Sequence, residues 1–197
     1  MFLRSDAIID WQRPAILACS RRLGAADADK LAYARRCFEF VRDEIRHSWD
    51  YRQNPVTCAA SQVLAHATGY CYAKSHLLAA LLRAGGLPAG LGYQRLKLDD
   101  GRYCLHGLNA VKLPEYGWYR VDARGVTAEG AAGFCPPLER LAFAAVQAGE
   151  ADLPGIWAAP LAEVVQVLTT CRTYLEVYGN LPDCANAPGG YAADWRR

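Results

Sequence analysis

Residues 69–90, GYCYAKSHLLAALLRAGGLPAG, place a cysteine directly before a long apolar run. Residues 68–70 could begin a helix, so Cys71 would lie in the first helical turn. Unpaired backbone N–H groups there favour the thiolate and could hold an oxyanion. An ordinary buried thiol is the alternative, because free cysteine is among the most buried residue types. Cys71 is therefore a candidate nucleophile if a base accompanies it.

The chain has four histidines that could supply this base. His76 lies five positions after Cys71, about 140° around a helix, so the two side chains would diverge. His47 ends a charged segment and suits the exposed C-terminus of a helix. His66 has no motif around it. His106, in YCLHGLNAV, remains as the candidate base, although a histidine on a strand is also a common structural residue.

An aspartate could orient the imidazole of His106 and fix its tautomer. Asp122, in GWYRVDARG, lies sixteen residues further on, and Pro114 is the midpoint between the two. A hairpin centred on Pro114 would place His106 and Asp122 directly opposite each other on one face. An even loop over residues 114–117 would reverse the parity, so the pairing requires an odd loop or a bulge.

A zinc site is the competing use of the same residues. Cys104 and His106 are two positions apart and would share one face of a strand, where Cys71 could join them. The spacing fits no recognised zinc pattern, and the chain contains no CxxC pair. Core packing is the favoured role for Cys104, with oxidation against Cys71 as an alternative.

Hydrophobic spacing predicts the elements that must position these residues. Apolar residues at helical intervals predict helices over 13–23, 27–47, 59–66, 71–84, about 137–147 and 160–178. Alternation with a period of two predicts strands over 89–98, 104–113 and 117–123. The helix over 71–84 is apolar on nearly every side and belongs at the centre of a domain. The order predicts an α+β fold, an antiparallel sheet against a central helix, with flanking N- and C-terminal helices.

The composition excludes several classes of protein. A chain of 197 residues with 52% hydrophobic and 21% charged residues is ordinary for a single folded domain. The net charge of +2 is too small to indicate a nucleic-acid or membrane-surface partner. The N-terminus lacks the apolar stretch of a secretory signal, and no run reaches the ~18 apolar residues of a membrane span. We therefore expect a cytoplasmic protein whose eight cysteines are reduced.

The order of a cysteine on a helix, then a histidine and an aspartate on successive strands, resembles the transglutaminase-like superfamily, whose fold is papain-like. The matching text is GYCYAKSHLLAALLRAGGLPAGLGYQRL, LHGLNAVKLPEYGWYRVDARG and, upstream, FEFVRDEIRHSWD. The similarity covers residues 37–125, leaving 126–197 as a mostly helical extension, and is greatest to small, stand-alone bacterial members. It implies Cys71 as nucleophile, His106 as general base and acid, and Asp122 as the orienting carboxylate. The calcium-site sequence of the large animal transglutaminases is not found in this chain, so we expect no metal, and no cofactor.

These residues predict a cysteine acyl-transfer enzyme that hydrolyses a peptide, protein or small amide substrate through a thioester. Transamidation or deamidation of glutamine side chains is the alternative outcome, because the sequence does not show which nucleophile enters. A non-catalytic binding or scaffold protein that keeps the fold is the alternative of another class. Tyr70 and Trp118 are the aromatic residues expected in the substrate groove. Tyr51, Asn54 and Gln62 are candidates for the second oxyanion donor.

Overall fold

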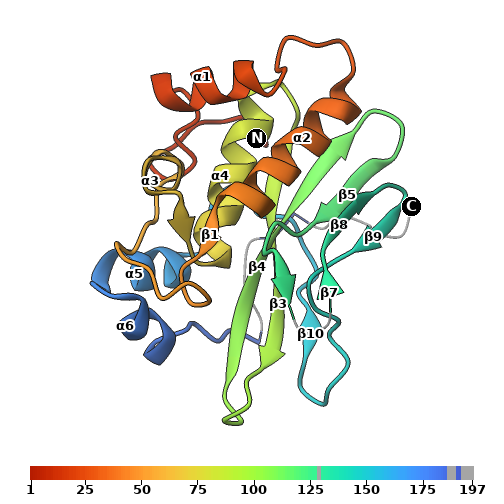
Figure 1. The fold of residues 1–197 in the computed structure, drawn as a ribbon. Helices are drawn as coiled ribbons and strands as arrows, with labels where there is room; N and C mark the ends of the chain where they lie inside the picture. The colour runs from red at the N-terminus through yellow and green to blue at the C-terminus, as the bar shows by residue number, and fades with distance from the viewer. Residues whose placement is uncertain (128–129, 186–189, 192–197) are drawn as a thin grey trace.

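The computed structural model describes residues 1–127, 130–185 and 190–191. Its helices are α1 (Pro14–Arg22), α2 (Lys30–Glu44), α3 (Ala60–His66), α4 (Cys71–Ala84), α5 (Ala162–Thr170) and α6 (Tyr174–Gly179). Its strands are β1 (Arg46–His47), β2 (Thr68–Gly69), β3 (Ala89–Lys97), β4 (Tyr103–Leu113), β5 (Gly117–Val121), β6 (Val126–Thr127), β7 (Gly130–Ala131), β8 (Gly133–Cys135), β9 (Leu138–Arg140) and β10 (Ala151–Asp152). Figure 1 shows the helices on one side of the long β3–β4 hairpin and β8, β9 and β10 on the other.

Helix α4 is the centre of the molecule. Every residue from Cys71 to Arg83 is buried, as the apolar pattern predicts for a helix surrounded by protein. The helix packs against α1, α2 and α3 on one side and against β3 and β4 on the other. Asn109 of β4 donates a hydrogen bond from its side chain to the carbonyl of Ser75, 2.9 Å away, and so ties the sheet to this helix. The predicted α+β architecture with a central helix is confirmed.

The main sheet has the order β10-β3-β4-β5, and all its neighbours are antiparallel. Strand β4 pairs with β5 from Leu113 opposite Gly117 to Asn109 opposite Val121. The loop between them is therefore the three residues 114–116, an odd number. This hairpin fixes which side chains of β4 and β5 share a face.

Of the two helices predicted in the C-terminal part, one is absent and the other is divided. Residues 137–147 form β9 and a loop, in which the carboxylate of Glu150 accepts hydrogen bonds from the N–H groups of Val146 and Gln147. The helix expected over 160–178 divides into α5 and α6, because the Thr173 side chain caps a new helix by accepting from the N–H of Glu176. The extension is therefore not mostly helical, since five short strands accompany α5 and α6 in its described residues.

No helix within residues 1–127, 130–185 and 190–191 has the length and apolar character needed to cross a membrane.

Candidate active site

Cys71 is the first residue of α4, where helix geometry leaves the backbone N–H groups without intrahelical partners. Its side chain is buried, with 8% of the residue exposed. The N–H of Gly107 on β4 donates to Cys71 Sγ at 3.5 Å. A Cβ atom at Gly107 would lie 3.0 Å from Tyr72 Cδ1 and 3.1 Å from Tyr72 Cα. Only glycine lets the strand approach the start of the helix this closely, a role that we did not predict for the residue beside His106.

His106 and Asp122 form a buried pair, with His106 Nε2 2.7 Å from Asp122 Oδ2. The carboxylate also accepts the N–H of Arg124 at 2.9 Å and the N–H of Ala142 at 3.0 Å. Because an ionised carboxylate only accepts hydrogen bonds, His106 Nε2 carries a proton. Nδ1 is then the nitrogen left to exchange a proton with a thiol.

The two members of this pair shift each other's pKa in opposite directions. Burial by itself lowers the pKa of His106, but the charge of Asp122 and the nearby Cys71 outweigh it and raise the pKa to about 10. Burial by itself raises the pKa of Asp122, but the charge of His106 and the hydrogen bonds to the carboxylate hold it below its ordinary value. The pair therefore favours an imidazolium beside a carboxylate.

The predicted register of the hairpin is wrong, although its parity is right. Continuing the pairing of Asn109 with Val121 places Asp122 opposite Leu108, just beyond the end of β5. His106 and Asp122 are therefore diagonal neighbours on one face, not direct partners. The odd loop preserves the shared face that the pairing requires.

A cleft of about 1300 Å³ opens over these residues, and both Cys71 and His106 line it. One wall includes Leu96 of β3, and the loop 141–147 contributes another. Phe143 of this loop meets the His106 ring edge-on, with 4.9 Å between ring centroids. Residues of the C-terminal part, including Tyr178, complete the lining. Space for a substrate therefore adjoins the thiol and the imidazole.

The two aromatic residues expected in the groove have different places. Tyr70 lines the cleft and donates its hydroxyl to the carbonyl of Tyr174 at 2.6 Å. Trp118 does not line it, so this prediction is wrong. Its partner on β4 is Lys112, six residues along the strand from His106. There it packs edge-on against Phe2, with 4.9 Å between ring centroids.

None of the three candidates for a second oxyanion donor lines the cleft. The side-chain oxygen of Gln62 accepts the N–H groups of Cys58 and Ala59 and so caps α3. The side-chain oxygen of Asn54 accepts the N–H of Tyr174 at 2.9 Å. Tyr51 is 59% exposed.

His47 is not at the surface, which corrects the prediction from the charged helix. Helix α2 ends at Glu44, and His47 lies on β1, paired in parallel with Gly69 of β2. The residue is buried and lines the cleft. By contrast, His76 donates Nδ1–H to the carbonyl of Cys58 at 2.8 Å, as expected for a structural histidine, and His66 is exposed.

The zinc alternative finds no support in the geometry. Within the part of the chain that the structure describes, no three His, Cys, Asp or Glu side chains form a group that could hold a metal ion. Cys104 lines the cleft and is buried, and burial raises the pKa of its thiol to about 12. This neighbour of the site is therefore a protonated thiol at neutral pH.

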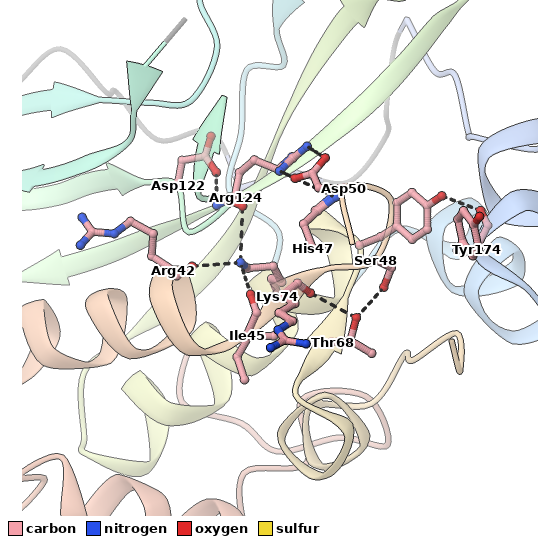
Figure 2. Close-up of polar contacts among 12 residues, drawn as sticks. Arg42, Ile45, His47, Ser48, Asp50, Thr68, Lys74, Asp122, Arg124 and Tyr174 are labelled. Atoms are coloured by element: carbon pink, nitrogen blue, oxygen red, sulfur yellow. Dashed lines mark hydrogen bonds and ion pairs between the residues drawn. The ribbon is translucent and has the colours of Figure 1, made fainter. Parts of the chain in front are cut away.

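Lys74 is a second residue whose importance we did not predict from the sequence, where it interrupts the apolar run. Its ammonium donates to the carbonyls of Ile45, Arg42 and Arg124 at 2.5, 3.3 and 3.4 Å (Figure 2). Burial lowers the pKa of Lys74 to about 8. Arg124 in turn holds the carboxylate of Asp50 through two hydrogen bonds of 2.5 and 2.8 Å. This network fixes the backbone at Arg124, whose N–H binds Asp122.

Comparison with known proteins relates this geometry to one family. The family model described as the transglutaminase-like superfamily matches residues 18–123, more than half of the chain. A candidate cysteine protease from Cytophaga hutchinsonii aligns with a TM-score of 0.52 and 15% identity over 62% of this chain and 40% of that one. The periplasmic domain of TgpA from Pseudomonas aeruginosa aligns with a TM-score of 0.47 and 25% identity over 62% and 45%. The chain thus spans less than half the length of either structure.

The first of these likenesses shows a shared fold and nothing about activity, because the sequence identity is only 15%. No curated protein sequence matches the chain.

Proposed function

The chain belongs to the transglutaminase-like superfamily, and from this membership we propose that it is a cysteine acyl-transfer enzyme. Cys71 is the nucleophile, His106 the general base and acid, and Asp122 the carboxylate that orients His106. The proposal depends chiefly on one observation, the buried His106–Asp122 pair at 2.7 Å, in which His106 lines the same cleft as Cys71. A buried imidazole held by a carboxylate beside a thiol is the arrangement that nucleophilic catalysis by cysteine requires.

In the first half of the reaction, the Cys71 thiolate attacks an amide carbonyl carbon. The C–S bond forms while the carbonyl π pair moves to oxygen. When this pair returns, the C–N bond breaks, and the leaving nitrogen takes a proton from the His106 imidazolium. The product is a thioester on Cys71 and a free amine.

In the second half, His106 removes a proton from an entering nucleophile, which attacks the thioester carbonyl and expels the Cys71 thiolate. With water as the nucleophile the products are a carboxylic acid and an amine, and we favour this outcome because water needs no binding site of its own. An amine in place of water gives transamidation. Peptides, proteins or small amides are the substrate class, and Tyr70 lines the cleft that would hold them.

Site-resolved alkylation tests this proposal directly. Iodoacetamide labelling of each of the eight cysteines, followed by mass spectrometry between about pH 5 and pH 9, is compared in wild type and His106→Ala. We expect Cys71 to label fastest at about pH 6, because the imidazolium of His106 stabilises its thiolate. Loss of His106 should remove this advantage.

Two controls come from the same molecule. Cys104 lines the same cleft, and its raised pKa predicts slow labelling at every pH below about 9. His76→Asn changes a different buried histidine, which lies on α4, and should leave Cys71 labelling unchanged. Labelling of Cys71 that is no faster than that of Cys104, or that is unaffected by His106→Ala, would contradict the proposal.

A further inference from the structure

His47 is buried in the candidate site without a hydrogen-bond partner. Only 6% of the residue is exposed, yet neither Nδ1 nor Nε2 has a partner among the described residues. Asp50 is the closest acid, with Oδ2 3.7 Å from Nδ1, beyond hydrogen-bond distance. Its carboxylate is already held by the guanidinium of Arg124 (Figure 2). Buried polar groups are nearly always satisfied, so an imidazole with two free nitrogens needs an explanation.

The backbone fixes this ring beside the start of α4. His47 pairs with Gly69, two residues before Cys71, and the N–H of Ser48 donates to the carbonyl of Gly69 at 3.1 Å. The ring meets that of Tyr70 edge-on, with 5.3 Å between centroids. His47 lines the same cleft as Cys71 and His106. A molecule bound over the thiol therefore occupies the cleft that His47 also lines.

The surroundings keep this ring neutral. Burial is the main cause that lowers the pKa of His47 well below its ordinary value, and the charges of Arg124, Lys74 and His106 act in the same direction. A neutral imidazole has one N–H donor and one acceptor nitrogen. Unlike an imidazolium, it does not compete with His106 for the thiolate, and it can still donate a hydrogen bond.

We propose that the N–H of His47 donates to the substrate carbonyl oxygen as negative charge develops on it, together with the backbone N–H groups at the start of α4. This inference rests on the proposed function, because the oxyanion forms only when Cys71 attacks. The His47 proton stays on nitrogen throughout. It stabilises the oxygen while the C–S bond forms, and the electron pair returns to carbon when the leaving group departs.

The test compares two reactions of the same thiol. Acylation of Cys71 by p-nitrophenyl acetate passes through an oxyanion, whereas alkylation by iodoacetamide displaces iodide and does not. His47→Phe and His47→Leu both replace the donor by an apolar side chain. Either variant is sufficient for the test if near-ultraviolet circular dichroism and thermal unfolding show that it folds. His47→Asn restores a donor near Nδ1, and His47→Gln restores one near Nε2.

We expect acylation to fall about 10²- to 10³-fold in the donor-free variants, the usual effect of removing one oxyanion donor. Alkylation of Cys71 should stay within about twofold of wild type, and one of the two amide variants should recover much of the acylation rate. Equal losses in both reactions, no loss in acylation, or no recovery in either amide variant would overturn the assignment of His47. Wild-type protein without Cys71-dependent acylation would instead overturn the proposed function, and this inference with it.

Discussion

Asp122 supplies the negative charge on which the imidazole of His106 depends. It is fully buried and accepts hydrogen bonds from His106 Nε2 and from the N–H groups of Arg124 and Ala142. Every donor around the carboxylate is thus directed at an acceptor that carries charge. Such a site tolerates neither loss of the charge nor an amide that brings its own donors.

Asp122→Asn removes the negative charge of this side chain and keeps its shape. The change removes the main cause that raises the pKa of His106 and presents an amide donor to groups that are themselves donors. We expect turnover of an activated ester to fall by about 10³-fold or more, as when the acid of a similar triad is neutralised. Stopped-flow acylation, with iodoacetamide labelling of Cys71 at about pH 6, measures the effect.

The matched control is Asp183→Asn, which removes an aspartate from the surface ion pair with Arg95. An ion pair of this kind contributes little to stability, so both rates should stay close to those of wild type. Equal rates in Asp122→Asn and wild type would show that His106 does not need the carboxylate.

The contact between His106 and Asp122 could be predicted from the sequence, but its register could not. Parity alone places the two residues on one face, given an odd turn. The turn signal at 114–117 fits loops of three or four residues, and the structure begins β5 at Gly117, whose φ of +71° favours glycine. His47 was misplaced because it continues the pattern of the charged helix before it. The role of Lys74 was missed because the carbonyls that it binds lie far along the chain.

At the scale of elements, the site depends on how closely β4 approaches the first turn of α4. Gly107 makes this approach possible, since a Cβ would meet backbone atoms of Tyr72, Cα at 3.1 Å and N at 3.3 Å. Backbone atoms of a buried helix cannot move aside in the way that the end of a side chain can. The distance from strand to helix therefore depends on the absence of one methyl group.

Gly107→Ala should displace the start of α4 from β4 and with it Cys71 from His106. We expect a loss of about 1–3 kcal/mol in the free energy of unfolding, as for other overpacked positions. Cys71 labelling at about pH 6 should fall at least tenfold. Urea unfolding and site-resolved alkylation measure the two effects.

Gly92→Ala is the control for Gly107→Ala, because its Cβ would meet only the side chain of Leu108, with Cδ1 at 2.8 Å. That side chain can rotate away, so Cys71 labelling should be retained even if some stability is lost. Similar labelling in the two variants would contradict a special role for Gly107.

The elements that the sequence predicted best are those with both a pattern and a local end signal. Asp29 caps α2 by accepting the N–H of Ala32 at 2.8 Å, and Gly85 follows the last residue of α4. The loop over residues 141–150 lacks such signals. Its shape depends on Glu150, which accepts the N–H of Lys97 on β3 as well as those of Val146 and Gln147. The spacing of apolar residues does not predict hydrogen bonds between a side chain and a distant backbone.

At the scale of the whole molecule, the cleft is built partly by residues that follow the family-matched region 18–123. The C-terminal part is held against that region by hydrogen bonds from Tyr70 to Tyr174 and from the N–H of Leu105 to the carbonyl of Pro182. Tyr178 stacks on Trp49, with 3.8 Å between ring centroids. The sequence predicts the shared core from its motifs. The wall of the cleft depends on long-range contacts that no motif marks.

The molecule as a whole should lose stability in mild acid, because it buries a histidine in neutral form. Burial lowers the pKa of His76 to about 4, against 6.5 for the unfolded chain. Below about pH 6.5 the unfolded state binds a proton that the folded state does not, so the free energy of unfolding falls as the pH falls towards about 4. The contribution of this one residue reaches about 2–3 kcal/mol near pH 4.5.

His76→Asn keeps a donor for the carbonyl of Cys58 but removes the titrating ring. Urea unfolding at about pH 6.5 and pH 4.5 should show this variant losing about 2–3 kcal/mol less than wild type between the two conditions, whatever its stability at neutral pH. His66→Asn, at an exposed position of α3, should lose as much as wild type. The same loss in His76→Asn and wild type would place the acid sensitivity elsewhere, and His47, also buried and neutral, would be the next residue to test.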